Sequence, residues 1–167
     1  IILTGLIDDI LELKPRQKMF GIFVASLVVY FLAGIKVREL SLPFLGHIQL
    51  GWWSFPLTIF WILALTNAVN LIDGLDGLAT GVTLISLVTM GIVGFFFLKS
   101  WQHYVPIMCI MLAACLLGFL PYNFHPAKIF LGDTGALYIG FMISVLSLKG
   151  LKNVTFVSLL VPILILG

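Results

Sequence analysis

The stretch that decides the fold is FPLTIFWILALTNAVNLIDGLDGL, which spans residues 55–78. Its first part, Phe55–Ile72, contains no charged side chain and has the length of one helical crossing of a bilayer about 30 Å thick. The stretch then runs into two Asp-Gly steps, at Asp73 and at Asp76. Glycine permits tight turns and a close approach of ligands to the backbone. The pattern therefore predicts a membrane-spanning helix that ends in an acidic turn.

The composition of the whole chain extends this prediction. Of the 167 residues, 61% are hydrophobic and 10% are charged, whereas soluble domains are close to half apolar and about a quarter charged. The apolar stretches are continuous rather than alternating, which favours helices over the strands of a membrane barrel. The other full apolar stretches are Met19–Ile35, Leu78–Leu98, Tyr104–Leu120, Ala136–Leu148 and Val154–Leu166, and Ile1–Ile7 is the end of one more.

We therefore predict an all-α polytopic membrane protein with about six full transmembrane helices and the end of one more, in a single transmembrane domain over residues 1–167. Because the chain begins with Ile1 inside an apolar stretch, we expect it to be an interior portion of a longer protein. In the 36–54 loop, the alternation in His47-Ile48-Gln49-Leu50 favours a short β-hairpin.

Counting the crossings places most of the acidic residues on one side of the membrane. Each spanning helix switches sides, so the segment after Ile7, the turn after Ile72 and the loop after Leu120 share one side. Six of the seven acidic residues lie there, and only Glu39 lies opposite; the six are Asp8, Asp9, Glu12, Asp73, Asp76 and Asp133. Lysine and arginine residues are divided between the two sides, so the positive-inside rule does not decide which side is cytoplasmic.

The first acidic group is Asp8-Asp9-x-x-Glu12. If the helix continues, Asp8 and Glu12 lie one turn apart on one face while Asp9 points elsewhere. Three carboxylates at a helix end repel one another, and Mg²⁺ suits hard carboxylate ligands that are shared with substrate phosphates. The alternative is a solvated helix end that is balanced by the basic residues which follow it.

The second group lies on the predicted helix over 55–72 and just beyond it. Asn67, Asn70 and Asp73 step by three and form a polar stripe on an otherwise apolar helix. Polar groups at such depth are costly and usually mark a functional interior. Hydrogen bonding between helices is the alternative for the two asparagines, but it does not explain the Asp-Gly steps.

The third group lies in the segment Tyr122–Gly135, where two glycines flank Asp133 at the expected start of a helix. An aspartate at that place is also an ordinary helix cap. His125 is either a solvated loop residue or a proton relay, and Lys128 suits a substrate phosphate or a lipid headgroup. Taken together, the three groups suit metal-assisted phosphoryl transfer at a membrane face.

Three ordered motifs resemble those of the polyprenyl-phosphate N-acetylhexosamine-1-phosphate transferases, over essentially the whole chain. They are Asp8-Asp9-x-x-Glu12, Asn67-x-x-Asn70-x-x-Asp73-Gly-x-Asp76-Gly-Leu and Asn123-x-x-Pro-Ala-x-x-Phe-x-Gly-Asp133-x-Gly. The stretch Tyr122–Asp133 is most similar to the teichoic-acid linkage-unit type. The histidine-rich cytoplasmic loop of the family would follow this chain, and His125 does not match it.

The resemblance implies an enzyme of the bacterial cell membrane that depends on Mg²⁺ or Mn²⁺, crosses the membrane many times and has its active site on the cytoplasmic face. It would transfer GlcNAc-1-phosphate from UDP-GlcNAc to undecaprenyl phosphate and release UMP, in the synthesis of a cell-wall polymer such as teichoic acid. Its partners would be these two substrates and the lipid bilayer, with no nucleic acid and with a homodimer left open.

The resemblance also implies roles for individual residues. Catalysis would fall to Asp8, Asp9, Asp73 and Lys18, and Asp133 would be the metal ligand. The substrate-binding residues would be Glu12, Asn67, Asn70, Asp76, Asn123, Lys128 and Phe130.

Other functions stay open at this point. The phospho-MurNAc-pentapeptide transferases of peptidoglycan synthesis belong to the same superfamily, but they carry lysine where this chain has Glu12. An ion-coupled transporter also uses intramembrane aspartate and asparagine, although its site lies near the middle of the membrane. A membrane scaffold would leave the three acidic groups without an explanation.

Overall fold

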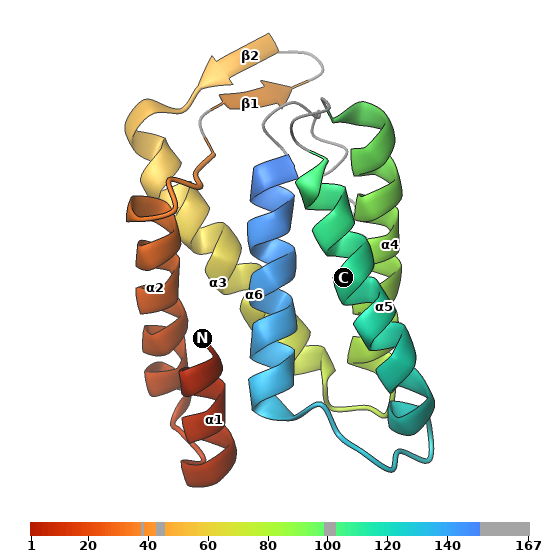
Figure 1. The fold of residues 1–167 in the computed structure, drawn as a ribbon. Coiled ribbons are helices and arrows are strands. Elements are labelled where there is room, and N and C mark those ends of the chain that lie inside the picture. The colour runs from red at the N-terminus through yellow and green to blue at the C-terminus, as the bar shows by residue number, and fades with distance from the viewer. Residues whose placement is uncertain (38, 43–45, 99–102, 151–167) are drawn as a thin grey trace.

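A computed structural model describes residues 1–37, 39–42, 46–98 and 103–150 of the chain (Figure 1). Within these residues there are six α-helices, two β-strands and one turn of 3-10 helix. The helices are α1 (Ile2–Leu11), α2 (Pro15–Phe31), α3 (Ser54–Ile72), α4 (Leu78–Phe97), α5 (Tyr104–Asn123) and α6 (Gly132–Gly150). The strands are β1 (Glu39–Leu42) and β2 (Gly46–Gln49), and the 3-10 turn is η1 (Gly51–Trp53).

The helix boundaries follow local signals in the sequence. Pro15 begins α2, because its fixed φ and its missing N–H suit the first turn of a helix. Glu12 ends α1 by adopting a left-handed conformation with φ 48°, so Asp8 and Glu12 do not share a helical face. Gly77, with φ 72°, turns the chain from the Asp-Gly steps into α4.

The helices lie close to the predicted apolar stretches. The helix α3 begins one residue before the predicted stretch over 55–72 and ends with it. The helix α5 continues three residues past Leu120, whereas α2 begins and ends four residues earlier than Met19–Ile35. The predicted stretch Val154–Leu166 lies outside the described residues.

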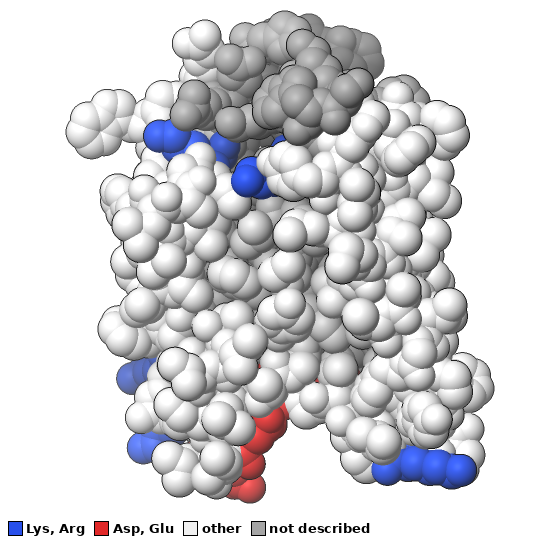
Figure 2. Space-filling view, viewed as in Figure 1, with Lys and Arg blue, Asp and Glu red and all other residues white. Residues whose placement is uncertain are grey.

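Three of the described helices are long and apolar enough to cross a membrane: Gly51–Ile72, Leu78–Phe96 and Tyr104–Asn123. The helix α2 has 17 residues, and α6 carries Asp133 in its first turn and Lys149 in its last. Figure 2 shows the charged side chains of this view near the two ends of the molecule, with a wide uncharged band between them. A helical bundle with an apolar outer surface of this kind is a membrane protein.

A small sheet lies at one end of the bundle, between α2 and α3 (Figure 1). The strands β1 and β2 pair antiparallel, with Glu39 opposite Gln49 and Leu42 opposite Gly46. The alternation over residues 47–50, which favoured a hairpin, corresponds to β2. Next to the sheet, Trp52 and Trp53 are exposed, as is usual for aromatic residues at a membrane interface.

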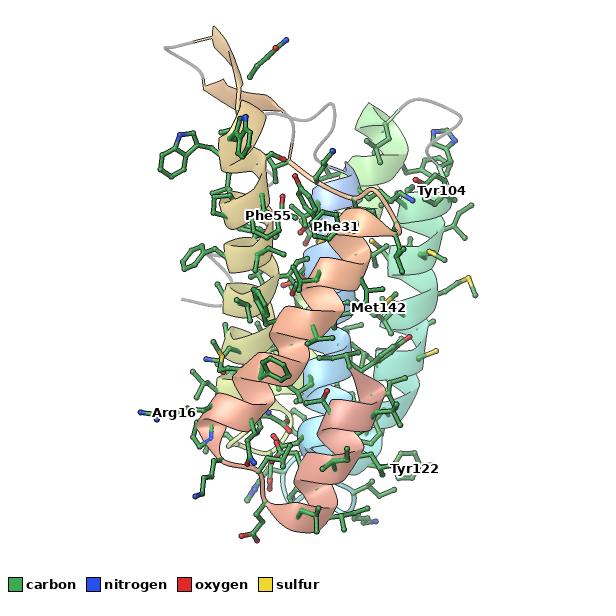
Figure 3. All side chains as sticks on the ribbon, turned by 90° about the vertical axis from the view of Figure 1, so that its left-hand side faces the viewer. Arg16, Phe31, Phe55, Tyr104, Tyr122 and Met142 are labelled. Atoms are coloured by element: carbon green, nitrogen blue, oxygen red, sulfur yellow. The ribbon has the colours of Figure 1, made fainter. Side chains whose placement is uncertain are left out.

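The helix α6 occupies the centre of the bundle and packs against α1, α3, α4 and α5 (Figure 1). The larger core cluster joins α4, α5 and α6 around Leu87, Cys109 and Ile143. Figure 3 shows Tyr104 near one end of the bundle and Arg16 and Tyr122 near the other. At this second end α1, α3 and α5 finish and α2, α4 and α6 begin, so the connections between them lie together.

The helices α3 and α6 approach each other closely at Gly140. A Cβ atom on Gly140 would lie 2.9 Å from the Cα atom of Thr66 and 3.0 Å from its carbonyl oxygen. Small residues let membrane helices approach in this way. The position of α6 against α3, and with it the position of Asp133, therefore depends on the absence of a side chain at residue 140.

We expect Gly140→Ala to lower the thermal unfolding midpoint of the full-length protein in detergent, because overpacking a helix contact costs about 1–3 kcal/mol. Gly118 of α5 provides the matched control, because no atom of the described residues, apart from the adjacent backbone of its own helix, lies within 4 Å of the place of its Cβ. Gly118→Ala should leave the midpoint unchanged or raise it slightly. Equal midpoints for the two variants would contradict the close packing.

Candidate active site

Lys18 of α2 is the centre of a charged network where the helix ends meet. Its ammonium nitrogen lies 2.5 Å from Asp8 Oδ2 and 2.7 Å from Asp133 Oδ1. It also donates to Asn70 Oδ1 at 3.2 Å, and Asn70 donates from Nδ2 to Asp133 Oδ1 at 2.5 Å. Side chains from α1, α2, α3 and α6 therefore meet at one point.

Asp8 is the buried member of this network, with a side chain that is 3% exposed. Its Oδ1 accepts the Leu13 N–H at 2.9 Å. Its Oδ2 receives no hydrogen bond of regular geometry from the described residues, but the Lys18 ammonium 2.5 Å away neutralises it. A buried carboxylate is costly unless it is paired, so the charge of Asp8 is committed to Lys18.

Asp9 points away from Asp8 and caps the first turn of α6. Its Oδ1 accepts the Asp133 N–H at 2.8 Å, and its Oδ2 accepts the Thr134 N–H at 3.1 Å. The Thr134 hydroxyl also donates to Oδ2, at 2.5 Å. The first N–H groups of a helix lack partners inside the helix and carry partial positive charge. A carboxylate of α1 thus accepts hydrogen bonds from two of the otherwise unpaired N–H groups in the first turn of α6.

An open pocket of about 410 Å³ borders the network. Figure 2 shows acidic side chains beside a hollow at this end of the molecule. The residues that line the pocket come from α1, from the end of α3 and the turn after it, and from the end of α5, the loop after it and the start of α6. They are Asp9, Asn70, Leu71, Asp73, Gly74, Leu75, Asp76, Asn123, Phe130, Gly132 and Asp133. Four of the six acidic residues that were predicted to share one side line it, and Asp8 lies behind it.

Asp73 titrates abnormally because of its surroundings. Burial and the negative charge of Asp133 raise the pKa of Asp73 to about 6. The negative charge of Asp133 therefore disfavours the ionised form of Asp73. A cation bound near these carboxylates would offset this effect, and Mg²⁺ characteristically uses one or two carboxylates together with substrate phosphates.

The donor atoms at Asp133 fit such a shared cation. Lys18 and Asn70 both bind Oδ1 of Asp133, while none of the hydrogen bonds among the described residues uses Oδ2. The described residues contain no group of three His, Cys, Asp or Glu side chains that could enclose a metal ion. A cation held at Asp133 would therefore need its remaining ligands from substrate and water.

Asp76 is held by the loop that follows α5. Its Oδ2 lies 2.9 Å from His125 Nδ1 and accepts the Ala127 N–H at 3.1 Å. These contacts with the His125 ring and the Ala127 N–H lower the pKa of Asp76. The His125 side chain is 81% exposed, yet it is not purely solvated, because its contact with Asp76 links the loop after α5 to the turn after α3.

Asn123 is a structural support of the pocket, because its amide is bonded on both sides. Its Oδ1 accepts the Thr80 hydroxyl at 2.6 Å, and its Nδ2 donates to the Ile129 carbonyl at 3.0 Å. The residue is 3% exposed. These bonds set the course of the loop that presents Phe130, whose side chain is 71% exposed at the pocket.

Three of the predicted substrate-binding residues do not line the pocket; they are Glu12, Asn67 and Lys128. Glu12 follows the end of α1 and is exposed. Asn67 is half-buried one turn deeper in α3 than Asn70. Lys128 is exposed, and its backbone N–H bonds to the Tyr122 carbonyl.

Sequence reasoning missed two hydroxyl residues that support the site, Thr80 and Thr134. Each binds a partner far away in the sequence, Asn123 and Asp9 respectively. The only signal was the position of Thr134 directly after Asp133 at an expected helix start. Nothing in the surroundings of Thr80 distinguishes it from a packing residue.

Comparison with known proteins places this geometry in context. Residues 1–151 match the family model described as glycosyl transferase family 4. A probable undecaprenyl-phosphate N-acetylglucosaminyl 1-phosphate transferase of Bacillus subtilis is 46% identical over 169 residues, which cover 100% of this chain and 46% of that protein.

Two further relatives are phospho-N-acetylmuramoyl-pentapeptide-transferases. The protein of Acetivibrio thermocellus is 40% identical over 83% of this chain and 45% of its own length. The protein of Listeria monocytogenes serovar 1/2a is 36% identical over 86% of this chain and 47% of its own length. The chain spans about half the length of the curated relatives that it matches.

The charged network leads to a prediction about stability. Lys18→Met should lower the thermal unfolding midpoint of the full-length protein markedly, because a buried charge without its partner costs about 3–5 kcal/mol. Adding Asp8→Asn should restore part of the loss. Arg16, an exposed residue of the same helix, is the control, and Arg16→Met should leave the midpoint unchanged. A normal midpoint for Lys18→Met alone would show that Asp8 does not depend on it.

Proposed function

The chain belongs to glycosyl transferase family 4, and we propose that the complete protein transfers GlcNAc-1-phosphate from UDP-GlcNAc to undecaprenyl phosphate and releases UMP. The name of the Bacillus subtilis relative, which aligns with all of this chain, supports the lipid acceptor and the sugar. The proposal concerns the complete protein, since the chain spans about half the length of its relatives.

The observation that carries the proposal is the convergence of three distant motifs on one pocket. Asp9, the Asn70–Asp76 segment and the Asn123–Asp133 segment all line it. The pocket combines carboxylates that suit a metal, glycine turns that admit a diphosphate, and the exposed ring of Phe130. These are the parts that metal-assisted transfer of a phosphosugar requires.

In the proposed reaction, an oxygen of the lipid phosphate attacks the phosphorus next to the sugar. The bond between that phosphorus and the oxygen bridging to UMP breaks, and UMP leaves with the electron pair. Asp8 is committed to Lys18 and Asp9 to the first turn of α6. Because the second pKa of a phosphate monoester is about 6, the lipid phosphate is mostly ionised at neutral pH. Catalysis then rests on positioning and charge stabilisation more than on proton removal.

We include Mg²⁺, or Mn²⁺, in the proposal because the donor atoms of the pocket fit it. Asp133, with Asp73 beside it, would hold the ion, which when bound offsets the charge of the diphosphate and polarises the phosphoryl oxygens. Lys18 and Asn70 fix one oxygen of Asp133 and leave the other for the ion. Asn123 and its partners keep the loop with Phe130 at the edge of the pocket.

The proposal also covers membrane topology. We propose that α2 to α6 all cross the bacterial cell membrane. The sixth crossing that the sequence predicts, Val154–Leu166, lies outside the described residues. The pocket then opens to the cytoplasm, where nucleotide sugars are found. The product would enter the synthesis of a cell-wall polymer of the teichoic-acid type.

A second candidate is the transfer of phospho-MurNAc-pentapeptide, which the names of the relatives at 40% and 36% identity suggest. The sequence separated the two branches by Glu12, but Glu12 is exposed and does not line the pocket. The choice of donor therefore has to be tested directly, by offering both nucleotide sugars to the same enzyme.

The decisive test of the proposed function is which bond is broken. Full-length enzyme is incubated with undecaprenyl phosphate and with UDP-GlcNAc that carries radioactive phosphorus in the position next to the sugar. We expect the label in the lipid product and unlabelled UMP in solution. Label released as UDP would mean attack at the sugar carbon and would overturn the mechanism. Turnover with UDP-MurNAc-pentapeptide alone would establish the second candidate instead.

Asp133→Asn should reduce kcat by roughly 10²-fold or more, the scale of losing one charge-stabilising group. The thermal midpoint should stay close to that of the wild type, because Lys18 keeps Asp8 as its partner. Glu39→Gln is the control, since Glu39 lies in β1 at the opposite end of the bundle, and its turnover should be normal. An Asp133→Asn enzyme with near-normal turnover would remove Asp133 from the site.

A further inference from the structure

Thr134 joins α6 to α1 through a short hydrogen bond to Asp9, and neither the sequence motifs nor the proposed reaction gives it a role. Its hydroxyl donates to Asp9 Oδ2 at 2.5 Å, and its N–H donates to the same oxygen at 3.1 Å. The other carboxylate oxygen accepts the N–H of Asp133. Both oxygens of Asp9 are thus engaged by two consecutive residues of α6.

The backbones at this contact are also pressed together. A Cβ on Gly5 of α1 would lie 2.4 Å from Thr134 Cα and 2.9 Å from Thr134 N. Gly132 has φ 68°, and a Cβ on it would lie 3.3 Å from Asp9 Oδ1. There is no room for a side chain at Gly5 or at Gly132. The distance and orientation of α1 relative to the start of α6 are therefore narrowly restricted.

The consequence concerns Asp133, which lies directly before Thr134. Its backbone is fixed by Asp9 from one side, and its carboxylate is fixed by Lys18 and Asn70 from the other. Rotation of the first turn of α6 would carry Oδ2 of Asp133 away from the pocket. The Thr134 hydroxyl resists that rotation, because it adds a third donor to the carboxylate that holds the turn.

We propose that Thr134 is a positioning residue, which acts through Asp9 to hold the Asp133 carboxylate in the orientation that the reaction uses. The inference rests on the proposed function, in which Asp133 is the metal ligand. It changes the role of Asp9 from a catalytic group to the support of Asp133. Because Asp9 already accepts three hydrogen bonds, it acts by geometry and not by taking a proton from the lipid.

The test compares Thr134→Val with Thr134→Ser in the full-length enzyme. Valine keeps the shape and removes the hydroxyl, whereas serine keeps the hydroxyl. Thr89→Val is the matched control, because the Thr89 hydroxyl bonds only to the Ile85 carbonyl of its own helix among the described residues. For each variant we measure kcat and KM for UDP-GlcNAc per folded enzyme, the thermal midpoint, and Mn²⁺ binding to substrate-free enzyme by electron paramagnetic resonance.

For Thr134→Val we expect kcat to fall by about 10-fold or more with KM within about twofold, as for an interaction that matters in the transition state. The dissociation constant for Mn²⁺ should rise several-fold. Thr134→Ser should recover both quantities, and Thr89→Val should behave as the wild type.

Two outcomes would overturn the inference. If Thr134→Val lowers only the midpoint and keeps normal kcat and Mn²⁺ binding, the hydroxyl is merely structural. If serine does not rescue turnover, the hydrogen bond is not what matters. The Asp133→Asn variant distinguishes a failure of the Thr134 inference from a failure of the proposed function. If Asp133→Asn binds Mn²⁺ like the wild type, Asp133 is not the metal ligand, and the proposed function fails independently of Thr134.

Discussion

The ion pair between Asp8 and Lys18 is the interaction on which the rest of the site depends. A carboxylate that is 3% exposed at a helix end near lipid requires a counter-charge, and that requirement fixes α2 against α1. The Lys18 ammonium also bonds to Asp133 and Asn70. The lysine that neutralises Asp8 therefore also holds α3 and α6 next to α1 and α2. The pocket is the space that remains where these helices meet the two loops.

Asp8 and Asp9 have different partners because Asp8 must pair with Lys18. In a helix, adjacent side chains point about 100° apart, so Asp8 and Asp9 cannot serve the same partner. Asp8 turns inward to Lys18, and Asp9 turns to the first turn of α6. Asp73 and Asp133 both line the pocket, and the negative charge of Asp133 disfavours the ionised form of Asp73, an effect that a bound cation would offset.

Much of this could be predicted from the sequence, because the relevant signals are local. The uncharged stretch over 55–72 predicted α3 within one residue, and the parity of crossings placed Asp73 and Asp133 on one side. The family that the three motifs indicated is confirmed. What the sequence could not show depends on contacts over more than forty residues: Asn123 bonded to Thr80, and Asp9 bonded to Thr134. The end of α1 at Leu11, which removes Glu12 from the pocket, depends on one backbone angle.

The sequence separations in the charged network have a consequence for how the protein is made. Asp8 and Lys18 are ten residues apart, whereas Asp133 follows Lys18 by 115 residues. When the chain is threaded into a bilayer from its N-terminal side, Asp8 enters together with its own counter-charge, and α1 and α2 can insert as a neutral hairpin. Asp133 is delivered only after α3 to α5 have been synthesised. Asp8 and Lys18 together have a formal charge of zero, and the addition of Asp133 gives the group of three a formal charge of one negative unit. The network therefore acquires a net negative charge, which favours a divalent cation, only when the bundle is complete.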